Sequence, residues 1–466
     1  MRAWRWLPLG GYAALLLATA PPWPDGWDGV GFVESVRDFD MGRFRPHPPG
    51  YPVYVALLRL AALLGGTPLR ACVRVAVASG VVAVLLAWDA ARRCAGERAA
   101  WGVAILFAVA PGVWRASNGV GSEAPALACA AACAWGLVAA ARGPRRIGPA
   151  IALGLGAGLG LGVRLSWAPL YAAALAMASR ANRGRAWPAA AAACGAWAVP
   201  LVAWVGPGKL ASLFAEHFGG HALHWGGTAL TEPGPVRALW LARDIFVDGF
   251  GLETGALGLA TAAVFAVVMG QALVAWRAAY WRGLRGCLGL AVPYLIWIGL
   301  GQNLRDQPRH ALPLVALLAA GLALPAAGSR RAFAVVGALA GMVSLRTALD
   351  AHERRTIPPP GQQLVDLARA QPSPERLTVF GVASVRYFET TELASRALAV
   401  GSLGEARMEL TRANELPARV WVTGEVAGVD DSRGTLHPFA KLCRPVRLER
   451  ARPCLDVYEW AFGAGR

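Results

Sequence analysis

Apolar stretches recur along most of the chain, separated by short polar breaks that are rich in arginine. Stretches near twenty residues with few charges match the length of an α-helix that crosses the hydrocarbon core of a membrane. We therefore predict a mostly α-helical, polytopic transmembrane bundle with about eleven spans. The predicted spans are residues 6–22, 72–90, 99–115, 123–141, 147–163, 166–179, 187–206, 254–276, 286–303, 310–328 and 332–347.

One apolar stretch, Tyr51 to Gly65, is left out of these spans. It has only about fifteen residues, against roughly twenty for a spanning helix, and Arg59 interrupts it. Counting it as a span would place the later arginine-rich loops on the opposite side of the membrane. We therefore expect a helix that lies in the outer interface.

Charged residues are few, and they sort to one side of the predicted spans. Only 16% of the residues are charged, and the net charge of +17 is nearly all arginine, since Lys209 and Lys441 are the only lysines. Small arginine clusters between spans follow the positive-inside rule and argue against nucleic-acid binding. They are Arg2 and Arg5; Arg92, Arg93 and Arg98; Arg142, Arg145 and Arg146; Arg180, Arg183 and Arg185; Arg277, Arg282 and Arg285; and Arg330 and Arg331. We predict a multi-pass protein of a bacterial-type inner (plasma) membrane with a cytoplasmic N-terminus.

A polar region follows the last predicted span. Its proline-rich start, "RRTIPPPGQQ", divides the chain into a transmembrane domain at 1–349, a linker at 350–360 and a small extracytoplasmic α/β domain at 361–466. The stretches "RLTVFGV", "ARVWVTGEV" and "CLDVYEW" predict strands, and residues 361–370 and 403–414 predict helices. Cys443 and Cys454 lie in this domain, where an oxidising compartment would allow a disulfide between them.

An acidic segment follows the first predicted span. Apolar residues at helical spacing predict an amphipathic helix at 29–40. Glu34 and Asp38 lie four residues apart on this helix, and we expect Glu34 on its solvated surface. The turn "HPPGYP" with His47 comes next, in which prolines fix φ and a glycine permits a tight reversal.

Asp28 just after the first span, the amphipathic helix and "HPPGYP" together resemble the first outer loop of GT-C membrane glycosyltransferases, in particular the protein O-mannosyltransferase-like family 39. Weaker likenesses are "GSEAPAL" at 121–127, "GVRLSWAP" at 162–169 and "QPRHALPL" at 307–314. The resemblance covers residues 6–348 and leaves out the C-terminal domain. Many relatives have Asp-Glu where this chain has Asp28-Gly29, so a second carboxylate is missing there.

The resemblance implies a glycosyltransferase that moves a hexosyl or pentosyl group from a polyprenyl-phosphate-linked donor to an acceptor glycan, lipid or protein at the outer membrane face. A lipid phosphate is a good leaving group, so one base suffices, in contrast to the two carboxylates of a glycosidase. We predict Asp28 as that base. Asp38 and Asp40 form a D-x-D motif, which either assists catalysis by holding a divalent cation such as Mg²⁺ or Mn²⁺ or is a solvated pair of acids.

Further candidates lie at the predicted outer ends of spans. Glu123 opens a span, either as a catalytic group or as a helix N-terminal acid that the helix dipole stabilises. Arginine suits bidentate contact with phosphate, although a boundary arginine can instead extend to lipid headgroups. The predicted substrate-binding residues are His47, Arg164, Arg305, Arg309 and His310.

The long loop 207–253 contains His217, His221 and His224. His217 and His221 are four residues apart, which on a helix suits zinc, but Gly219-Gly220 between them disfavours a helix. We expect instead that this loop covers the outer cavity and contacts donor or acceptor.

Two other classes of protein stay open. A multi-span transporter or flippase of lipid-linked saccharide would place polar groups near the midplane, in broken helices of related repeats. In this chain the conspicuous charges lie at one predicted face, and no internal repeat is evident. The third reading is a membrane anchor without catalysis that displays the C-terminal domain.

Overall fold

The protein divides into two compact units. This computed structural model describes residues 7–142, 147–182, 184–224, 226–275, 281–305, 307–412, 417–426, 428–429, 436–445 and 453–461. The membrane unit comprises Met1–Pro21 and Ser35–His352, and the C-terminal unit comprises Pro22–Glu34 and Glu353–Arg466. Predicted features that lie outside the described residues are Arg2, Arg5, Arg145, Arg146, Arg183, Arg277 and the end of the 403–414 helix.

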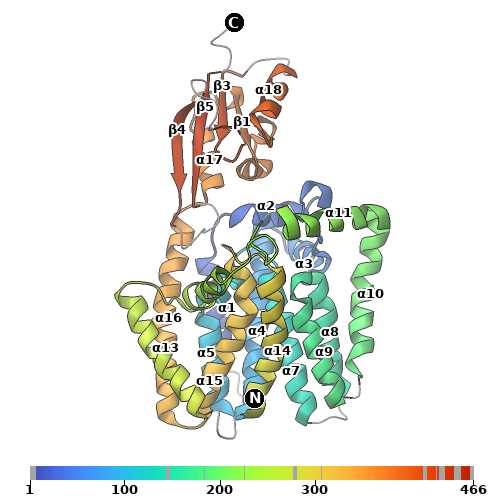
Figure 1. Ribbon diagram of the computed structural model, residues 1–466, viewed down its shortest axis with the longest axis vertical. Helices are drawn as coiled ribbons and strands as arrows, with labels where there is room; N and C mark the ends of the chain where they lie inside the picture. Colours follow the sequence, from blue (N-terminus) through green and yellow to red (C-terminus); the bar gives the residue numbers. More distant parts are fainter. Residues whose placement is uncertain are drawn as a thin grey trace. The chain divides into compact units, whose positions relative to one another are not determined.

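Long helices packed side by side make up the membrane unit (Figure 1). Its helices are α1 (Leu7–Thr19), α3 (Pro52–Ala62), α4 (Pro68–Ala95), α5 (Glu97–Val109), α6 (Pro111–Asn118), α7 (Glu123–Arg142), α8 (Ile147–Val163), α9 (Ala168–Asn182), α10 (Ala186–Val205), α11 (Pro207–Gly219), α12 (Val236–Ala242), α13 (Ala256–Ala275), α14 (Trp281–Gly301), α15 (Leu312–Ala323) and α16 (Arg330–Thr356). Each predicted span falls on one of these helices or on the broken pair α5 and α6. The prediction of a polytopic helical bundle is confirmed.

The helices differ in length. Within the described ranges, five are long and apolar enough to cross a membrane by themselves, or six if α5 and α6 form one broken span. The bend of 67° between α5 and α6 falls at Ala110-Pro111, where proline cannot donate the next helical hydrogen bond. Helix α3, predicted as an interface helix, has 11 residues, well short of the roughly twenty that span a bilayer.

Glycines on α8 bring its neighbours close. A Cβ at Gly158 would lie 2.7 Å from the Ala193 Cβ of α10, and one at Gly156 would lie 2.9 Å from the Cys129 carbonyl oxygen of α7. Membrane helices commonly associate through small residues in this way, because close backbone approach increases van der Waals contact. Helix α8 is therefore packed between α7 and α10.

The region between α10 and α13 is largely helical. Helix α11 runs into a π-helix at Gly220–His224, and α12 runs into a second π-helix at Arg243–Asp248. The buried Arg237 side chain ties this region to the end of α14, because it donates hydrogen bonds to the carbonyls of Gly299 and Gln302, each at 3.0 Å. The predicted loop 207–253 is thus held by the Arg237 cation, which binds carbonyls at the end of α14 that have no partner within the helix.

The C-terminal unit is a small α/β structure. Its elements are α2 (Gly26–Ser35), α17 (Pro360–Arg369), β1 (Leu377–Gly381), β2 (Ala397–Ala399), α18 (Leu403–Arg412), β3 (Arg419–Thr423), β4 (Leu436–Cys443) and β5 (Cys454–Trp460). The strand order is β2-β1-β3-β5-β4, with β1 parallel to β2 and β3, and β5 antiparallel to β3 and β4. The three predicted strands correspond to β1, β3 and β5, and the predicted disulfide joins Cys443 to Cys454 across β4 and β5.

The segment after α1 departs from its predicted structure. Helix α2 ends at Ser35, so the predicted helix 29–40 begins earlier and is shorter than expected. Val30 of α2 packs in the core of the C-terminal unit with residues such as Leu364 and Trp421. Glu34, expected on the surface, is 8% exposed, which corrects that prediction. Helix α16 continues to Thr356, so the first part of the predicted linker 350–360 is helical.

Candidate active site

A buried ion pair joins two segments of the membrane unit. Glu123 begins α7, and Arg164 follows α8, where the chain turns into a short 3₁₀ helix. The Arg164 Nη1 atom donates to Glu123 Oε1 at 2.9 Å and to Ser122 Oγ at 3.0 Å. Arg164 is 4% exposed and Glu123 is 9% exposed. Since a buried charge is costly unless it is paired, this pair holds the start of α7 against the end of α8.

Arg164 also retains binding capacity. Its Nε atom is buried and has no hydrogen-bond partner among the residues that the structure describes. Guanidinium groups bind planar oxygen anions through parallel N–H donors, so a buried, partly unused guanidinium suits a phosphate oxygen. Phosphate contact by Arg164 stays a prediction, and the hydrogen bond to Glu123 orients its guanidinium.

A second basic group lies near this ion pair. His310 is 7% exposed, and its Nδ1 atom is 2.7 Å from the Asn303 carbonyl oxygen. The Tyr294 hydroxyl donates to the His310 carbonyl at 2.8 Å, which holds the 3₁₀ turn Pro308–Ala311 against α14. The charges of Arg164 and Arg309 act electrostatically on the His310 ring. The predicted residues from loops far apart in the sequence therefore gather in one region.

Histidines extend this region toward the "HPPGYP" turn. The Tyr51 hydroxyl lies 2.7 Å from His47 Nε2. The His47 ring centroid lies 5.7 Å from that of His217, which lies 4.6 Å from that of His221. His221 in turn interacts electrostatically with His310. The tight turn, α11 and the π-helix Gly220–His224 thus contribute a row of three imidazoles, His47, His217 and His221.

The rings of His217 and His221 lie close together although Gly219 and Gly220 come between them in the sequence. Gly219 and Gly220 were expected to spoil the helix, whereas α11 passes directly into a π-helix. Among the described residues, no group of three or more His, Cys, Asp or Glu side chains is arranged to hold a metal ion. The side chain of His224 lies outside what the structure describes.

The D-x-D acids and Arg305 contact other charged side chains. Asp38 pairs with Arg45 at 3.1 Å. The Asp40 carboxylate accepts a hydrogen bond from Gly42 N at 2.9 Å and caps the 3₁₀ helix Met41–Arg43. The Arg305 side chain, which is 63% exposed, pairs with Glu232 at 3.1 Å. Asp38 and Asp40 thus have local partners, whereas Arg305 pairs with a residue 73 positions away. Their catalytic and substrate-binding roles stay predictions.

Asp28 belongs to the C-terminal unit rather than to the membrane unit. It lies in the first turn of α2 and is 9% exposed. An acid in the first helical turn is stabilised by the positive end of the helix dipole.

Sequence analysis missed two acids, Asp244 and Asp248, that are 1% and 5% exposed. They lie on the π-helix Arg243–Asp248, which packs against the Pro308–Ala311 turn. Such π-helical turns recur at functional sites in α-helical proteins. A signal was present in the sequence "ARDIFVD", since two acids four residues apart in an apolar stretch share one helix face.

A further ion network was also missed. Asp350 of α16 pairs with Arg115 of α6 at 2.6 Å and with Arg346 at 3.0 Å, and Arg346 also pairs with Glu253. The network ties the second half of the broken span to α16. Arg346 and Asp350 are four residues apart on α16, so their spacing was visible in the sequence, whereas Arg115 and Glu253 are remote from them and carried no such signal.

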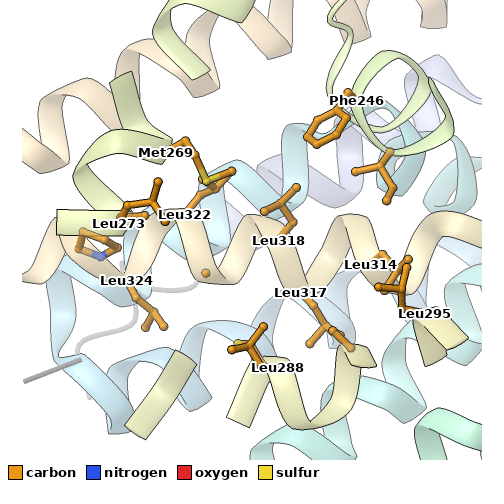
Figure 2. A pocket seen from close by; sticks show the side chains of 16 residues that line it. Phe246, Met269, Leu273, Leu288, Leu295, Leu314, Leu317, Leu318, Leu322 and Leu324 are labelled. Atoms are coloured by element: carbon orange, nitrogen blue, oxygen red, sulfur yellow. The ribbon is translucent and has the colours of Figure 1, made fainter. Parts of the chain in front are cut away.

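An apolar cavity of about 310 Å³ opens between α13, α14 and α15. Figure 2 shows Leu314, Leu317, Leu318 and Leu322 of α15 along it, with Phe246 of the second π-helix at one end. That π-helix also packs against the turn that carries His310. The cavity is therefore linked through one element to the cluster of basic residues.

Comparison with solved structures identifies the class of fold. The structure of ArnT from Cupriavidus metallidurans bound to undecaprenyl phosphate matches with a TM-score of 0.61 and 13% identity, and the match covers 98% of each chain. The Archaeoglobus fulgidus oligosaccharyltransferase in the apo form matches with a TM-score of 0.48 and 14% identity, covering 91% of this chain and 70% of that one. The fold is that of the GT-C membrane proteins.

The sequence comparison agrees for part of the chain. Residues 46–204 match the family model of dolichyl-phosphate-mannose-protein mannosyltransferases. No curated protein sequence matches. The matched segment contains His47, Glu123 and Arg164, so it includes the buried ion pair. The resemblance to GT-C membrane glycosyltransferases of the family 39 type is confirmed.

Proposed function

We propose that this protein transfers a sugar from a polyprenyl-phosphate-linked donor to an acceptor at the outer face of the membrane. The observation that carries the proposal is the buried Arg164, oriented by Glu123, with an unused Nε donor and with Arg309 and His310 nearby. Guanidinium and imidazole donors placed in this way suit a phosphate that gains negative charge as it leaves. The family match of residues 46–204, with its printed mannosyltransferase description, supports the same reaction class.

The chemistry requires one bond exchange. The bond between the sugar's anomeric carbon and the phosphate oxygen breaks, and its electron pair leaves with the polyprenyl phosphate. An acceptor oxygen forms the new bond to the anomeric carbon, and its proton passes to a base. Asp28 is the proposed base, and Arg164, Arg309 and His310 are the proposed phosphate contacts.

The apolar cavity between α13, α14 and α15 supports a lipid-linked donor. Its lining is almost wholly aliphatic and aromatic, and it is linked to the basic cluster through the π-helix Arg243–Asp248. Burial of methylene groups is worth about 0.8 kcal/mol each, so a cavity of this kind suits an isoprenoid chain. ArnT, whose fold this chain shares, was solved with undecaprenyl phosphate bound.

The proposal includes an orientation. The N-terminus is cytoplasmic, and the "HPPGYP" turn, Glu123, Arg164 and the C-terminal unit face the extracytoplasmic side, as the positive-inside rule predicts. In a bacterial-type envelope this face is that of the inner membrane. The acceptor is then a glycan, lipid or protein of the cell envelope.

Turnover of synthetic donors tests the proposal. The purified full chain in liposomes receives polyprenyl-phosphate-linked hexoses and pentoses, together with glycan, lipid or protein acceptors. We expect wild type to consume one donor, Arg164→Gln to be slower by about 100-fold or more, and Asp28→Asn to be slower by about 100-fold or more. Arg412→Gln is the control, because Arg412 forms an exposed pair with Glu409 at 3.2 Å in the C-terminal unit.

Two results would count against the proposal. Full transfer by an Asp28→Asn protein that inserts normally would refute the assignment of the base. Full donor consumption by Arg164→Gln would refute the phosphate site, because the cluster would then lack its buried cation.

A further inference from the structure

The C-terminal unit contains a segment from the other end of the chain. Residues Pro22–Glu34, which carry Asp28, form one compact unit with residues Glu353–Arg466. Helix α2 has 10 residues, and isolated helices shorter than about 12 to 15 residues are marginal in water. Helix α2 therefore depends on packing from the rest of this unit.

Two buried arginines and the half-buried Asp25 form an ion cluster that fixes the start of α2. Asp25, directly before the helix, accepts hydrogen bonds from Arg444 Nη1 and from Arg354 Nε, each at 3.0 Å. Arg354 and Arg444 are each 3% exposed, and Arg444 Nη2 also donates to the Arg354 carbonyl at 3.4 Å. Arg354 comes from the last turn of α16, and Arg444 follows β4. One carboxylate thus binds two arginines from distant parts of the sequence.

Three other contacts hold the same segment. Val30 packs in the core of the C-terminal unit. The Arg386 guanidinium lies 5.7 Å from the ring centroid of Trp27, and the Tyr387 hydroxyl donates to the Pro24 carbonyl at 3.4 Å. The contacted residues lie both before and after Asp28 in the sequence. The backbone that carries Asp28 is therefore determined by the C-terminal unit.

The same packing bears on the missing second carboxylate. A Cβ at Gly29 would lie 3.2 Å from the Cβ of Pro24, tighter than most real contacts. A glutamate after Asp28 would therefore require Pro24 to move. Glycine at position 29 therefore suits the close approach of α2 to Pro24.

We infer that the C-terminal unit positions Asp28 for glycosyl transfer, through the Asp25, Arg354 and Arg444 cluster. This inference rests on the proposed function, and it makes those three residues positioning residues for the base. Loss of the cluster would leave α2 formed less of the time, so Asp28 would meet the acceptor less often. A misplacement of about 1 Å can lower a rate by about 100-fold.

Kinetics and hydrogen exchange of the full chain in liposomes test the inference together. The variants are Asp25→Asn, Arg444→Gln and the conservative Asp25→Glu. Arg369→Gln is the matched control, because Arg369 forms an exposed pair with Glu392 at 2.8 Å in the same unit. We expect the first two to lower kcat by about tenfold to 100-fold with little change in the KM for the lipid donor. Asp25→Glu restores part of kcat, and the control behaves as wild type.

Amide exchange gives a readout that does not depend on activity. We expect the α2 peptide to exchange faster in Asp25→Asn and Arg444→Gln, while the strands β1 and β3 stay protected. If Arg444→Gln unfolds the sheet, Arg386→Met takes its place, because it loosens the Trp27 contact and leaves the ion cluster intact. Unchanged kcat in an active enzyme, or unchanged α2 exchange in both variants, overturns the inference. A wild type without any transfer refutes the proposed function instead, and exchange then still decides whether the cluster holds α2.

Discussion

The guanidinium of Arg164 and the carboxylate of Glu123 lie almost completely inside the membrane unit, and each needs the other. Both residues could be nominated from the sequence, because an ionisable group at the end of an apolar span is expensive to bury. Their pairing could not, since 41 positions separate them. The acids Asp244 and Asp350 escaped notice because their partners are equally remote or lie on an irregular helix.

Removing one member of this pair should be costly. In Glu123→Gln the buried charge of Arg164 loses its partner, and we expect a loss of about 3–5 kcal/mol in stability. The double variant Glu123→Leu with Arg164→Leu should recover most of that stability and still lack transfer. Thermal unfolding of the detergent-solubilised protein measures the difference. Glu409→Gln, which breaks an exposed pair, should change stability by about 1 kcal/mol or less; an equal loss in both variants would contradict the burial argument.

Acid should weaken the cluster around Asp25. Burial acts to raise the pKa of Asp25, but the charges of Arg354 and Arg444 outweigh it and hold the pKa below its ordinary value of 3.8. A pKa lowered on folding contributes stability above about pH 4, and that contribution is lost as the pH falls through the native pKa. The gap in melting temperature between wild type and Asp25→Asn should therefore be widest at pH 7 and should begin to shrink as the pH falls below about 4. A gap of constant width would contradict the ion cluster.

At the scale of elements, the length of apolar runs was sufficient to place the long helices of the membrane unit. A long apolar run predicts a helix because a helix satisfies all of its backbone hydrogen bonds internally in lipid. The presence of each helix is therefore predicted even where its first and last residues are not. Run length does not report how the helix is interrupted. The break at Ala110-Pro111 comes from a proline that run length does not register. The π-helix Gly220–His224 brought together His217 and His221, which Gly219 and Gly220 were expected to separate.

The glycines of α8 give a prediction at this scale. Gly158→Leu should force α8 and α10 apart, because a Cβ there already lies 2.7 Å from the Ala193 Cβ. We expect a loss of about 1–3 kcal/mol or more from overpacking, measured as lowered thermal stability. Gly195→Leu on α10 is the control, since nothing lies within 4 Å of a Cβ at that position. Equal tolerance of both substitutions would show that α8 and α10 are not in close contact.

At the scale of the whole molecule, the sequence separated a membrane part from a polar part but assigned residues 22–34 to the wrong neighbours. Proximity in the sequence favoured the first span, whereas Val30 and Asp25 find their partners more than three hundred positions away. The three predicted strands were found because alternating apolar residues mark them locally. Strands β2 and β4 were not predicted, since β2 is short and β4 is mostly exposed.

The disulfide tests the orientation of the molecule. Cys443 and Cys454 form a disulfide that should persist only in an oxidising, extracytoplasmic compartment. In intact cells we expect a membrane-impermeant maleimide to label both cysteines only after mild reduction. Cys94, an exposed free cysteine at a predicted cytoplasmic arginine cluster, should react only after permeabilisation. The opposite pattern would invert the proposed topology.

The fate of the donor lipid tests the central claim most directly. Liposomes that contain the wild-type chain and its polyprenyl-phosphate-linked sugar are incubated with acceptor. The lipids are then identified and quantified by mass spectrometry. A glycosyltransferase releases polyprenyl phosphate in step with the glycosylated acceptor, and the Arg164→Gln protein should form far less of both. Recovery of the intact donor, moved to the opposite leaflet with its sugar still attached, would contradict glycosyl transfer and establish translocation instead.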